Sequence, residues 1–147
     1  MKVAIGADHA GFDLKTVLVE HLISRGIEVD DFGAFELVPT DDFVEYAHAV
    51  AKTVASGAHD RGILICSSGI GMSVAANKVR GIRAALCTTE HMAHLARSDN
   101  DANVLALGGG EIGPNLARSI VDTWLDTEFA DKPRYVRRIG KLELPER

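Results

Sequence analysis

The stretch GILICSSGIGMSVAANK, residues 62–78, joins an apolar run to a helical pattern through a turn that contains two glycines. Its first five residues, Gly62–Cys66, have the length and the branched apolar side chains of a buried strand. A helix is expected from about Gly71 to Lys78. A strand, a glycine turn and a helix in this order predict a βαβ unit, in which parallel strands are covered by helices.

The same alternation extends through the rest of the chain. Four more strands are predicted at Lys2–Gly6, Ile27–Asp31, Ile82–Cys87 and Ala102–Leu107. Four more helices are predicted at residues 12–25, 43–56, 90–98 and 114–125, the first closed by Gly26 and the last opened by Pro114. The sequence therefore predicts a single α/β domain over residues 1–147. Its sheet is expected to be five-stranded, parallel and doubly wound, with a helical C-terminal tail.

The composition narrows the class of protein. With 147 residues, of which 46% are hydrophobic and 25% charged, the chain matches one globular domain. The net charge of -5 argues against a nucleic-acid partner. No apolar run approaches the roughly 18 residues of a membrane helix. Because no secretory signal is found either, a cytoplasmic protein without a membrane partner is expected, with two reduced cysteines and no disulfide.

The turn after the strand at residues 62–66 leaves two interpretations of Cys66. Glycines at 69 and 71 let backbone N–H groups converge at a helix N-terminus, which suits an anion and activates a nearby thiol. Alternatively, Cys66 is a small buried apolar side chain, the commonest role of a free cysteine. Cys87 is followed by Thr-Thr-Glu, without a glycine turn, and is interpreted as a structural thiol.

Nucleotide and metal motifs are incomplete. Gly69 and Gly71 lack the third glycine of the dinucleotide pattern GxGxxG, which would fall at Val74, and the P-loop motif GxxxxGK[ST] does not occur. A dinucleotide-dependent oxidoreductase is therefore disfavoured. His91 and His94 lie three residues apart on a predicted helix, without a third ligand nearby, so no metal site is expected.

Three polar groups have both a structural and a functional interpretation. Asp8 and His9 follow the first strand, where they form a helix cap or bind a substrate hydroxyl or phosphate. Asp99–Asp101 precede the last strand and have the composition of a plain turn. Arg134 and Arg138 are four residues apart, so on a helix both guanidinium groups share one face. Such a pair suits a phosphate, or it is a solvated basic helix end.

Five segments give the sequence a resemblance to a known family. They are DHAGF (8–12), CSSGIGMSVAANK (66–78), GIRAALC (81–87), NDANVLALGG (100–109) and the Arg-x-x-x-Arg tail. Together, over nearly the whole chain, they resemble type-B ribose-5-phosphate isomerases and the related galactose-6-phosphate isomerases. The resemblance implies a Rossmann-like fold and interconversion of aldose and ketose phosphates through a cis-enediol(ate), without metal or other cofactor. It also implies a homodimer, or a tetramer, with sites between the subunits.

The resemblance implies roles for the candidate residues. Cys66, as the thiolate, would move a proton between two substrate carbons, and Ser68 would pass one between the substrate oxygens. Backbone N–H groups of the turn would hold the enediolate oxygen, the tail arginines would hold the phosphate, and Asn100 would come from the partner subunit. The implied substrate-binding residues are Asp8, His9, Ser67, Gly69, Ile70, Gly71, Asn100, Arg134 and Arg138.

Three positions depart from the family pattern. Asp99 stands in place of the histidine that opens the furanose ring, Gly110 in place of an arginine, and Phe43 lies where a Tyr-Pro pair is common. Asp99 becomes the candidate ring-opening acid/base. The hypothesis is an isomerase with ribose 5-phosphate as the default substrate. The alternatives are a tetrose 4-phosphate, which closes no ring, a hexose 6-phosphate, or a sugar-phosphate-binding protein without catalysis.

Overall fold

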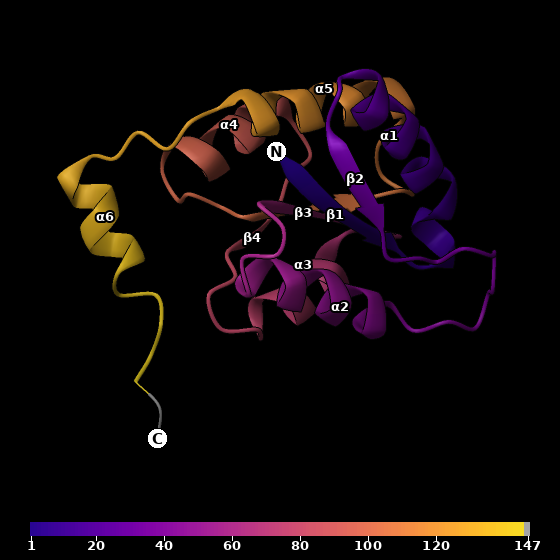
Figure 1. The fold of residues 1–147 in the computed structure, drawn as a ribbon, viewed down its shortest axis with the longest axis horizontal. Helices are drawn as coiled ribbons and strands as arrows, with labels where there is room; N and C mark the ends of the chain where they lie inside the picture. Colours follow the sequence, from indigo (N-terminus) through magenta and orange to yellow (C-terminus); the bar gives the residue numbers. More distant parts are fainter. Residues whose placement is uncertain (146–147) are drawn as a thin grey trace.

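The sheet contains five parallel strands, as the sequence predicts (Figure 1). The structure is a computed structural model and describes residues 1–145. The strands are β1 (Lys2–Ala7), β2 (Glu28–Asp31), β3 (Arg61–Cys66), β4 (Ala84–Leu86) and β5 (Val104–Gly108). They lie in the order β2-β1-β3-β5-β4. The predicted strand at residues 82–87 is shorter than expected, and the one at 102–107 begins two residues later.

The three central strands are buried on both faces. β1, β3 and β5 consist almost entirely of buried residues, which explains why their sequences are apolar runs without polar alternation. The edge strands β2 and β4 contain no buried residue and are four and three residues long. Short edges with half-exposed side chains are the usual form of strands that have only one neighbour.

Helices cover the sheet on both faces. They are α1 (Phe12–Ser24), α2 (Phe43–Ala55), α3 (Ile70–Asn77), α4 (Glu90–Ser98), α5 (Pro114–Asp126) and α6 (Pro133–Ile139), with a 3-10 turn η1 at His9–Gly11. Apolar side chains of α1, α4 and α5 form one core with the sheet, and those of α2 and α3 form the other. The predicted doubly wound α/β fold is therefore confirmed.

The winding places a crevice between β1 and β3. The helix after β1, α1, packs on one face, whereas the helix after β3, α3, packs on the other. Neighbouring strands whose helices diverge in this way leave an opening at their carboxyl ends, where α/β proteins bind ligands. Residues 8–11 directly follow β1 and residues 67–69 directly follow β3, so both turns lie at this switch point.

The C-terminal helix α6 stands apart from this body. No residue of α6 is buried, and Figure 1 shows it on the far left, beyond the segment that follows α5. The predicted helical tail is thus present, but within the chain it makes little contact with the sheet. None of the described helices is both long and apolar enough to cross a membrane.

Candidate active site

Cys66 ends β3 with its side chain 6% exposed and its sulfur in a polar contact. The backbone N–H of Gly69 donates a hydrogen bond to Cys66 Sγ at 3.2 Å. This is possible because Gly69 has a φ of 81°, from which the chain turns directly into α3. The sulfur therefore lies close to a backbone donor and to the N-terminus of a helix, both of which carry positive partial charge.

The second cysteine differs in its surroundings. Cys87 is 1% exposed, and burial raises the pKa of its thiol to about 11. Among the described residues, the one hydrogen bond of its thiol is a weak one, from Sγ to the carbonyl of Ala85 at 3.9 Å. Cys87 therefore has the surroundings of a structural thiol, as the missing glycine turn predicts.

The turn after Cys66 is braced by the turn after β5. Gly109 N–H donates to the Cys66 carbonyl at 2.7 Å, and Gly110 N–H donates to the Ser67 carbonyl at 2.9 Å. Ser68 Oγ accepts the N–H of Ile70 at 3.2 Å. Gly110, the position without the expected arginine, is thus directly beside Ser67. The N–H groups of Gly69 and Ile70 are engaged within the turn, whereas the N–H of Gly71 lies in the first turn of α3 and has no intrahelical acceptor.

The turn after β1 is packed against both of these turns. Asp8 is buried, and its Oδ1 accepts the N–H groups of Ala10 at 3.0 Å and Gly11 at 3.2 Å. A Cβ atom on Gly11 would overlap the carbonyl of Ile65, and one on Gly109 would lie 2.7 Å from the Ala10 carbonyl oxygen. Glycines therefore allow the three turns to approach within backbone contact. The capping role of Asp8 is confirmed, and it leaves Oδ2 without a hydrogen bond to the described residues.

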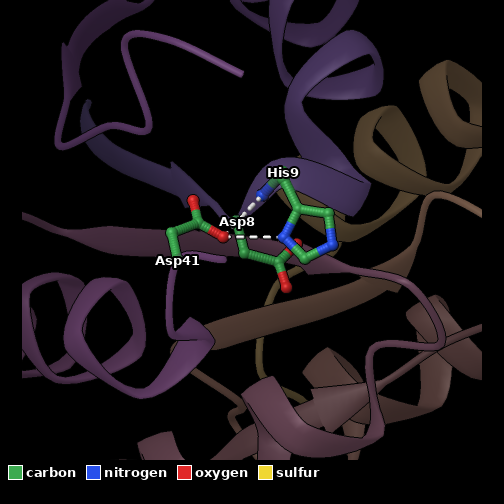
Figure 2. Close-up of side chains that lie close together, drawn as sticks. All are labelled: Asp8, His9 and Asp41. Carbon is green, nitrogen blue, oxygen red and sulfur yellow. Dashed lines mark hydrogen bonds and ion pairs between the residues drawn. The ribbon is translucent and has the colours of Figure 1, made fainter. Parts of the chain in front are cut away.

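His9 is held by Asp41, which is itself held by Tyr46, and neither residue is among the candidates that the sequence predicts. Its Nδ1 lies 2.7 Å from Oδ1 of Asp41, whose Oδ2 accepts the Tyr46 hydroxyl at 3.1 Å (Figure 2). This hydrogen bond and the charge of Asp8 raise the pKa of His9 above its ordinary value of 6.5. Asp41 lies in the loop between β2 and α2, 32 residues from His9, and no local pattern connects the two.

The ring of Phe43 lies on the other side of this opening, against α3. A Cβ atom on Gly71 would be only 2.8 Å from the Phe43 ring. Phe43 lies where a Tyr-Pro pair is common in the family that the sequence resembles. The structure places this ring at the start of α3, where Gly71 makes room for it, and the phenol of Tyr46 is the nearby hydroxyl that contacts Asp41.

The remaining predicted residues form a second group, away from Cys66. Asp99 and Asn100 follow α4 and precede β5. They therefore lie where the strands begin, opposite to the carboxyl ends of the strands. Asp99 Oδ1 accepts the Ser98 hydroxyl at 2.7 Å. A cavity of about 570 Å³ lies between this end of α4 and the start of α6, with Asp99 and Tyr135 among its walls. The structure therefore brings Asp99, Asn100 and α6 to one region of the chain, remote from its own cysteine.

Arg134 and Arg138 share α6, as their spacing predicts, and both are exposed. Arg134 donates from Nη2 to the Tyr135 hydroxyl at 3.0 Å, and its guanidinium carbon lies 4.7 Å from the centre of that ring. Within residues 1–145 no carboxylate pairs with either arginine. The pair is thus available for an anion presented from outside the helix.

One group of possible metal ligands occurs among the described residues: Asp8, His9 and Asp41, whose ligand atoms lie within 4.8 Å of one another. The hydrogen bond between His9 Nδ1 and Asp41 Oδ1, and the two amides on Asp8 Oδ1, engage three of the possible ligand atoms. The group therefore has the geometry of a hydrogen-bonded network that positions an imidazole.

A parallel, doubly wound sheet with a thiol, an imidazole and glycine turns at its switch point defines an α/β protein with a small-molecule site. The chain belongs to the ribose/galactose isomerase family, whose model matches residues 3–142.

Individual relatives cover nearly the whole chain. Ribose-5-phosphate isomerase B of Escherichia coli (strain K12) is 49% identical over 141 residues, or 96% of this chain and 93% of that protein. D-erythrulose-4-phosphate isomerase of Pectobacterium atrosepticum is 41% identical, and the alignment covers 100% of this chain and 98% of that protein. The solved structure of Clostridium thermocellum ribose-5-phosphate isomerase B superposes with a TM-score of 0.94 at 49% identity, covering 97% of this chain and 95% of that one.

Proposed function

We propose that this protein is a metal-independent aldose–ketose isomerase of a sugar phosphate, with Cys66 as the base. The observation that carries the proposal is the position of Cys66: a nearly buried thiol at the carboxyl end of a central strand, bonded by Gly69 N–H at the start of α3. Family membership and the names of the relatives support the same reaction class.

The proposed reaction moves one proton between adjacent carbons. Cys66 Sγ, as the thiolate, takes the proton from the carbon beside the carbonyl, and the electron pair moves onto the carbonyl oxygen to give an enediolate. A backbone N–H group of the turn that is not engaged within it, such as that of Gly71 in the first turn of α3, stabilises that oxygen as its charge develops. Ser68 passes a proton between the two oxygens, and the thiol returns its proton to the neighbouring carbon, which regenerates the thiolate.

The substrate is proposed to be ribose 5-phosphate by default, with a tetrose 4-phosphate as its main rival. Asp99 stands in place of a ring-opening histidine and would have to act as the acid/base for a furanose. A tetrose 4-phosphate closes no such ring, and one relative that aligns over the full chain is named as a D-erythrulose-4-phosphate isomerase. A hexose 6-phosphate is a third candidate, because the family description includes galactose isomerases.

A second copy of the chain is proposed to complete the site. Asp99, Asn100 and the arginines of α6 are remote from Cys66 of their own chain, so they would reach the thiol of a partner. A cavity of about 600 Å³ beside the edge strand β4 supports such a contact, since its walls include Leu86, Met92, Leu95, Ile139 and Leu142. The proposal is a homodimer, with a tetramer as the alternative. A cytoplasmic location is part of it, because both cysteines are unpaired thiols.

The test compares wild type, Cys66→Ala and the control Cys87→Ala on ribose 5-phosphate, erythrose 4-phosphate and a hexose 6-phosphate. Turnover and solvent-deuterium incorporation at the substrate carbon are expected to vanish in Cys66→Ala and to persist in Cys87→Ala. Turnover of the tetrose alone would assign the substrate to that class. An unchanged rate in Cys66→Ala would overturn the role of the thiol.

The same experiments, together with calorimetry, distinguish the isomerase from a protein that binds a sugar phosphate without catalysis. If wild type binds a sugar phosphate in calorimetry but exchanges no deuterium with any of the three sugars, the protein is a sensor and not an isomerase. In the isomerase, Cys66→Ala is expected to retain binding, because the arginines and the turn amides remain.

A further inference from the structure

Asp41 holds the side chain of His9 in one orientation (Figure 2). Its Oδ1 lies 2.7 Å from His9 Nδ1 and also accepts the backbone N–H of His9 at 3.1 Å. Its Oδ2 accepts the Tyr46 hydroxyl at 3.1 Å. The Asp41 side chain is only 9% exposed. Three hydrogen bonds from two elements therefore fix a nearly buried carboxylate against one nitrogen of the imidazole.

This contact decides which imidazole nitrogen is free. Burial alone would raise the pKa of the Asp41 carboxyl, but hydrogen bonds from His9 and Tyr46 outweigh burial and hold that pKa below its ordinary value. Asp41 is therefore ionised at neutral pH and can only accept, so Nδ1 of His9 must carry a proton. Nε2 has no hydrogen-bond partner within residues 1–145, and Figure 2 shows it pointing away from Asp41.

The loop that carries Asp41 is fastened to the end of β1. The N–H of Ala7 donates to the Gly33 carbonyl at 2.8 Å, and the N–H of Ala34 donates to the Ala7 carbonyl at 2.6 Å. Lys15, which is 2% exposed, donates from Nζ to the Ala34 carbonyl at 2.6 Å. The same ammonium pairs with both carboxylate oxygens of Asp31 at 2.7 Å, so Lys15 ties the end of β2 and the start of the loop to α1. The start of the loop that carries Asp41 is therefore held against the end of β1.

The charged groups around the imidazole come from all three neighbouring elements. Asp8 lies on the same turn as His9, Asp41 on the loop, and Tyr46 on α2. Burial and the bond to Asp41 raise the pKa of the Tyr46 hydroxyl, and the charges of Glu45 and Asp8 raise it further. Every one of these groups is acidic. They favour the cationic imidazole, whose Nε2–H donates to an anionic or hydroxyl oxygen.

We propose that Asp41 is a positioning residue of the isomerase: it fixes the tautomer and orientation of His9, so that Nε2 is presented to an oxygen of the bound sugar phosphate. The identity of the ligand rests on the proposed function. The contact between His9 and Asp41 does not, and the two can be tested separately.

The first test measures the imidazole itself. Long-range 1H–15N NMR spectra are recorded across pH for wild type, Asp41→Asn and Asp41→Ala, with the His9 signals assigned from a His9→Gln variant. Wild type is expected to show Nδ1 protonated and a pKa above 6.5. Asp41→Asn keeps an acceptor but loses the charge, so the pKa is expected to fall while Nδ1 stays protonated. Asp41→Ala is expected to lower the pKa of His9 and also to let the proton of the neutral imidazole occupy either ring nitrogen.

Asp42→Asn is the matched control, because Asp42 is exposed and its side chain makes no capping hydrogen bond at the start of α2. Its His9 signals are expected to match those of wild type. If the His9 tautomer and pKa are the same in Asp41→Ala as in wild type, Asp41 does not position the ring and the proposal is overturned.

The second test measures turnover of ribose 5-phosphate, or of the sugar that wild type prefers. Loss of a carboxylate behind a ligating histidine typically weakens the site by about tenfold or more. Asp41→Ala is expected to raise KM about tenfold and to change kcat by less than about threefold, since His9 binds and does not abstract the carbon proton. Asp41→Asn should fall between wild type and Asp41→Ala.

An unchanged KM in Asp41→Ala, with the tautomer altered, would overturn the role given to Nε2. If wild type turned over no sugar phosphate, the proposed function would fail, and the NMR comparison would still decide whether Asp41 orients His9.

Discussion

At the scale of single residues, Gly69 has a left-handed backbone conformation, and other atoms lie close to the position that a Cβ atom would occupy. Its φ is 81°, and a Cβ atom there would lie 2.6 Å from Leu86 Cδ1 and 2.8 Å from the Leu107 carbonyl carbon. Gly26 offers a comparison, because its φ is 75° and a Cβ atom would meet no heavy atom within 4 Å. The two glycines therefore share the conformational requirement, and only Gly69 carries the steric one.

Alanine substitutions at these two positions are expected to separate the two costs. Gly26→Ala should lower the free energy of unfolding by about 1 kcal/mol, the cost of a left-handed alanine. Gly69→Ala should lower it by about 3 kcal/mol, because displacement of Leu86 and of the β5 backbone is added. Urea unfolding followed by the fluorescence of the buried Trp124, at one fixed protein concentration, measures both. Equal losses would show that the contacts at Gly69 cost nothing.

The same substitution is expected to affect the site. Gly69 N–H is the donor to Cys66 Sγ, so movement of this turn removes that contact and lowers turnover in Gly69→Ala. Gly26→Ala lies at the end of α1, in the turn before β2, and should keep wild-type turnover.

At the scale of the elements, the edge strand β2 is tied to α2 by His59. His59 is 6% exposed, and its Nδ1 lies 2.6 Å from Thr53 Oγ1 on α2 while its Nε2 lies 2.8 Å from Asp30 Oδ2 on β2. Lys2 Nζ lies 3.1 Å from the same carboxylate oxygen. β2 has only four residues and none of them is buried, so these polar contacts supply part of its attachment to the sheet.

His59→Ala is expected to lower the free energy of unfolding by about 2 kcal/mol, because two hydrogen bonds are lost and Thr53 is left without its partner. Turnover should be retained, since His59 precedes β3 and lies at the edge of the sheet opposite to Cys66. The control is His48→Ala, a half-buried histidine on α2 with no side-chain hydrogen bond to the described residues. A loss as large in His48→Ala would contradict a specific role for His59.

Acid should weaken this attachment in a defined direction. Hydrogen bonds from His59 and then Lys2 hold the pKa of Asp30 below its ordinary value of 3.8. Its contribution is therefore complete above pH 3.8 and is lost as the pH falls through the lower pKa of the folded state. Asp30→Asn cannot ionise, so the unfolding free energies of wild type and Asp30→Asn are expected to converge in that acid range.

At the scale of the whole molecule, the predicted site residues fall into two groups at opposite edges of the sheet. Cys66, Asp8 and His9 lie at the carboxyl ends of β3 and β1, whereas Asp99 and Asn100 precede β5 and the arginines lie on α6. No described contact joins the two groups within the chain. If both act on one substrate, they must come from two copies, and the exposed α6 is the element that reaches across (Figure 1).

Complementation between two inactive variants tests this arrangement. Cys66→Ala and the double variant Arg134→Gln/Arg138→Gln are each expected to be inactive or nearly so. When the two chains are coexpressed in equal amounts, half of the dimers are mixed and each mixed dimer has one site with both wild-type halves. About a quarter of wild-type activity is therefore expected to return. If thiol and arginines act within one chain, no site is complete and no activity returns.

The sequence by itself determined the elements and the turn that carries the thiol. All five strands and the helices from α1 to α5 lie within a few residues of their predicted ranges, because period and glycine placement are local properties. The glycine turn after Cys66 was readable for the same reason, since the residues that need left-handed backbone or close approach are adjacent in the chain.

Only the tertiary structure decided which polar groups meet. Asp41 bonds His9 and accepts the Tyr46 hydroxyl, and no spacing in the sequence encodes the path of the loop that brings Asp41 there. The path of the chain after α5 likewise places the arginines on an exposed helix away from Cys66. Contacts between residues far apart in the chain form so that nearly every buried polar group has a hydrogen-bond partner. Which partner each group finds is decided only when the whole chain is folded.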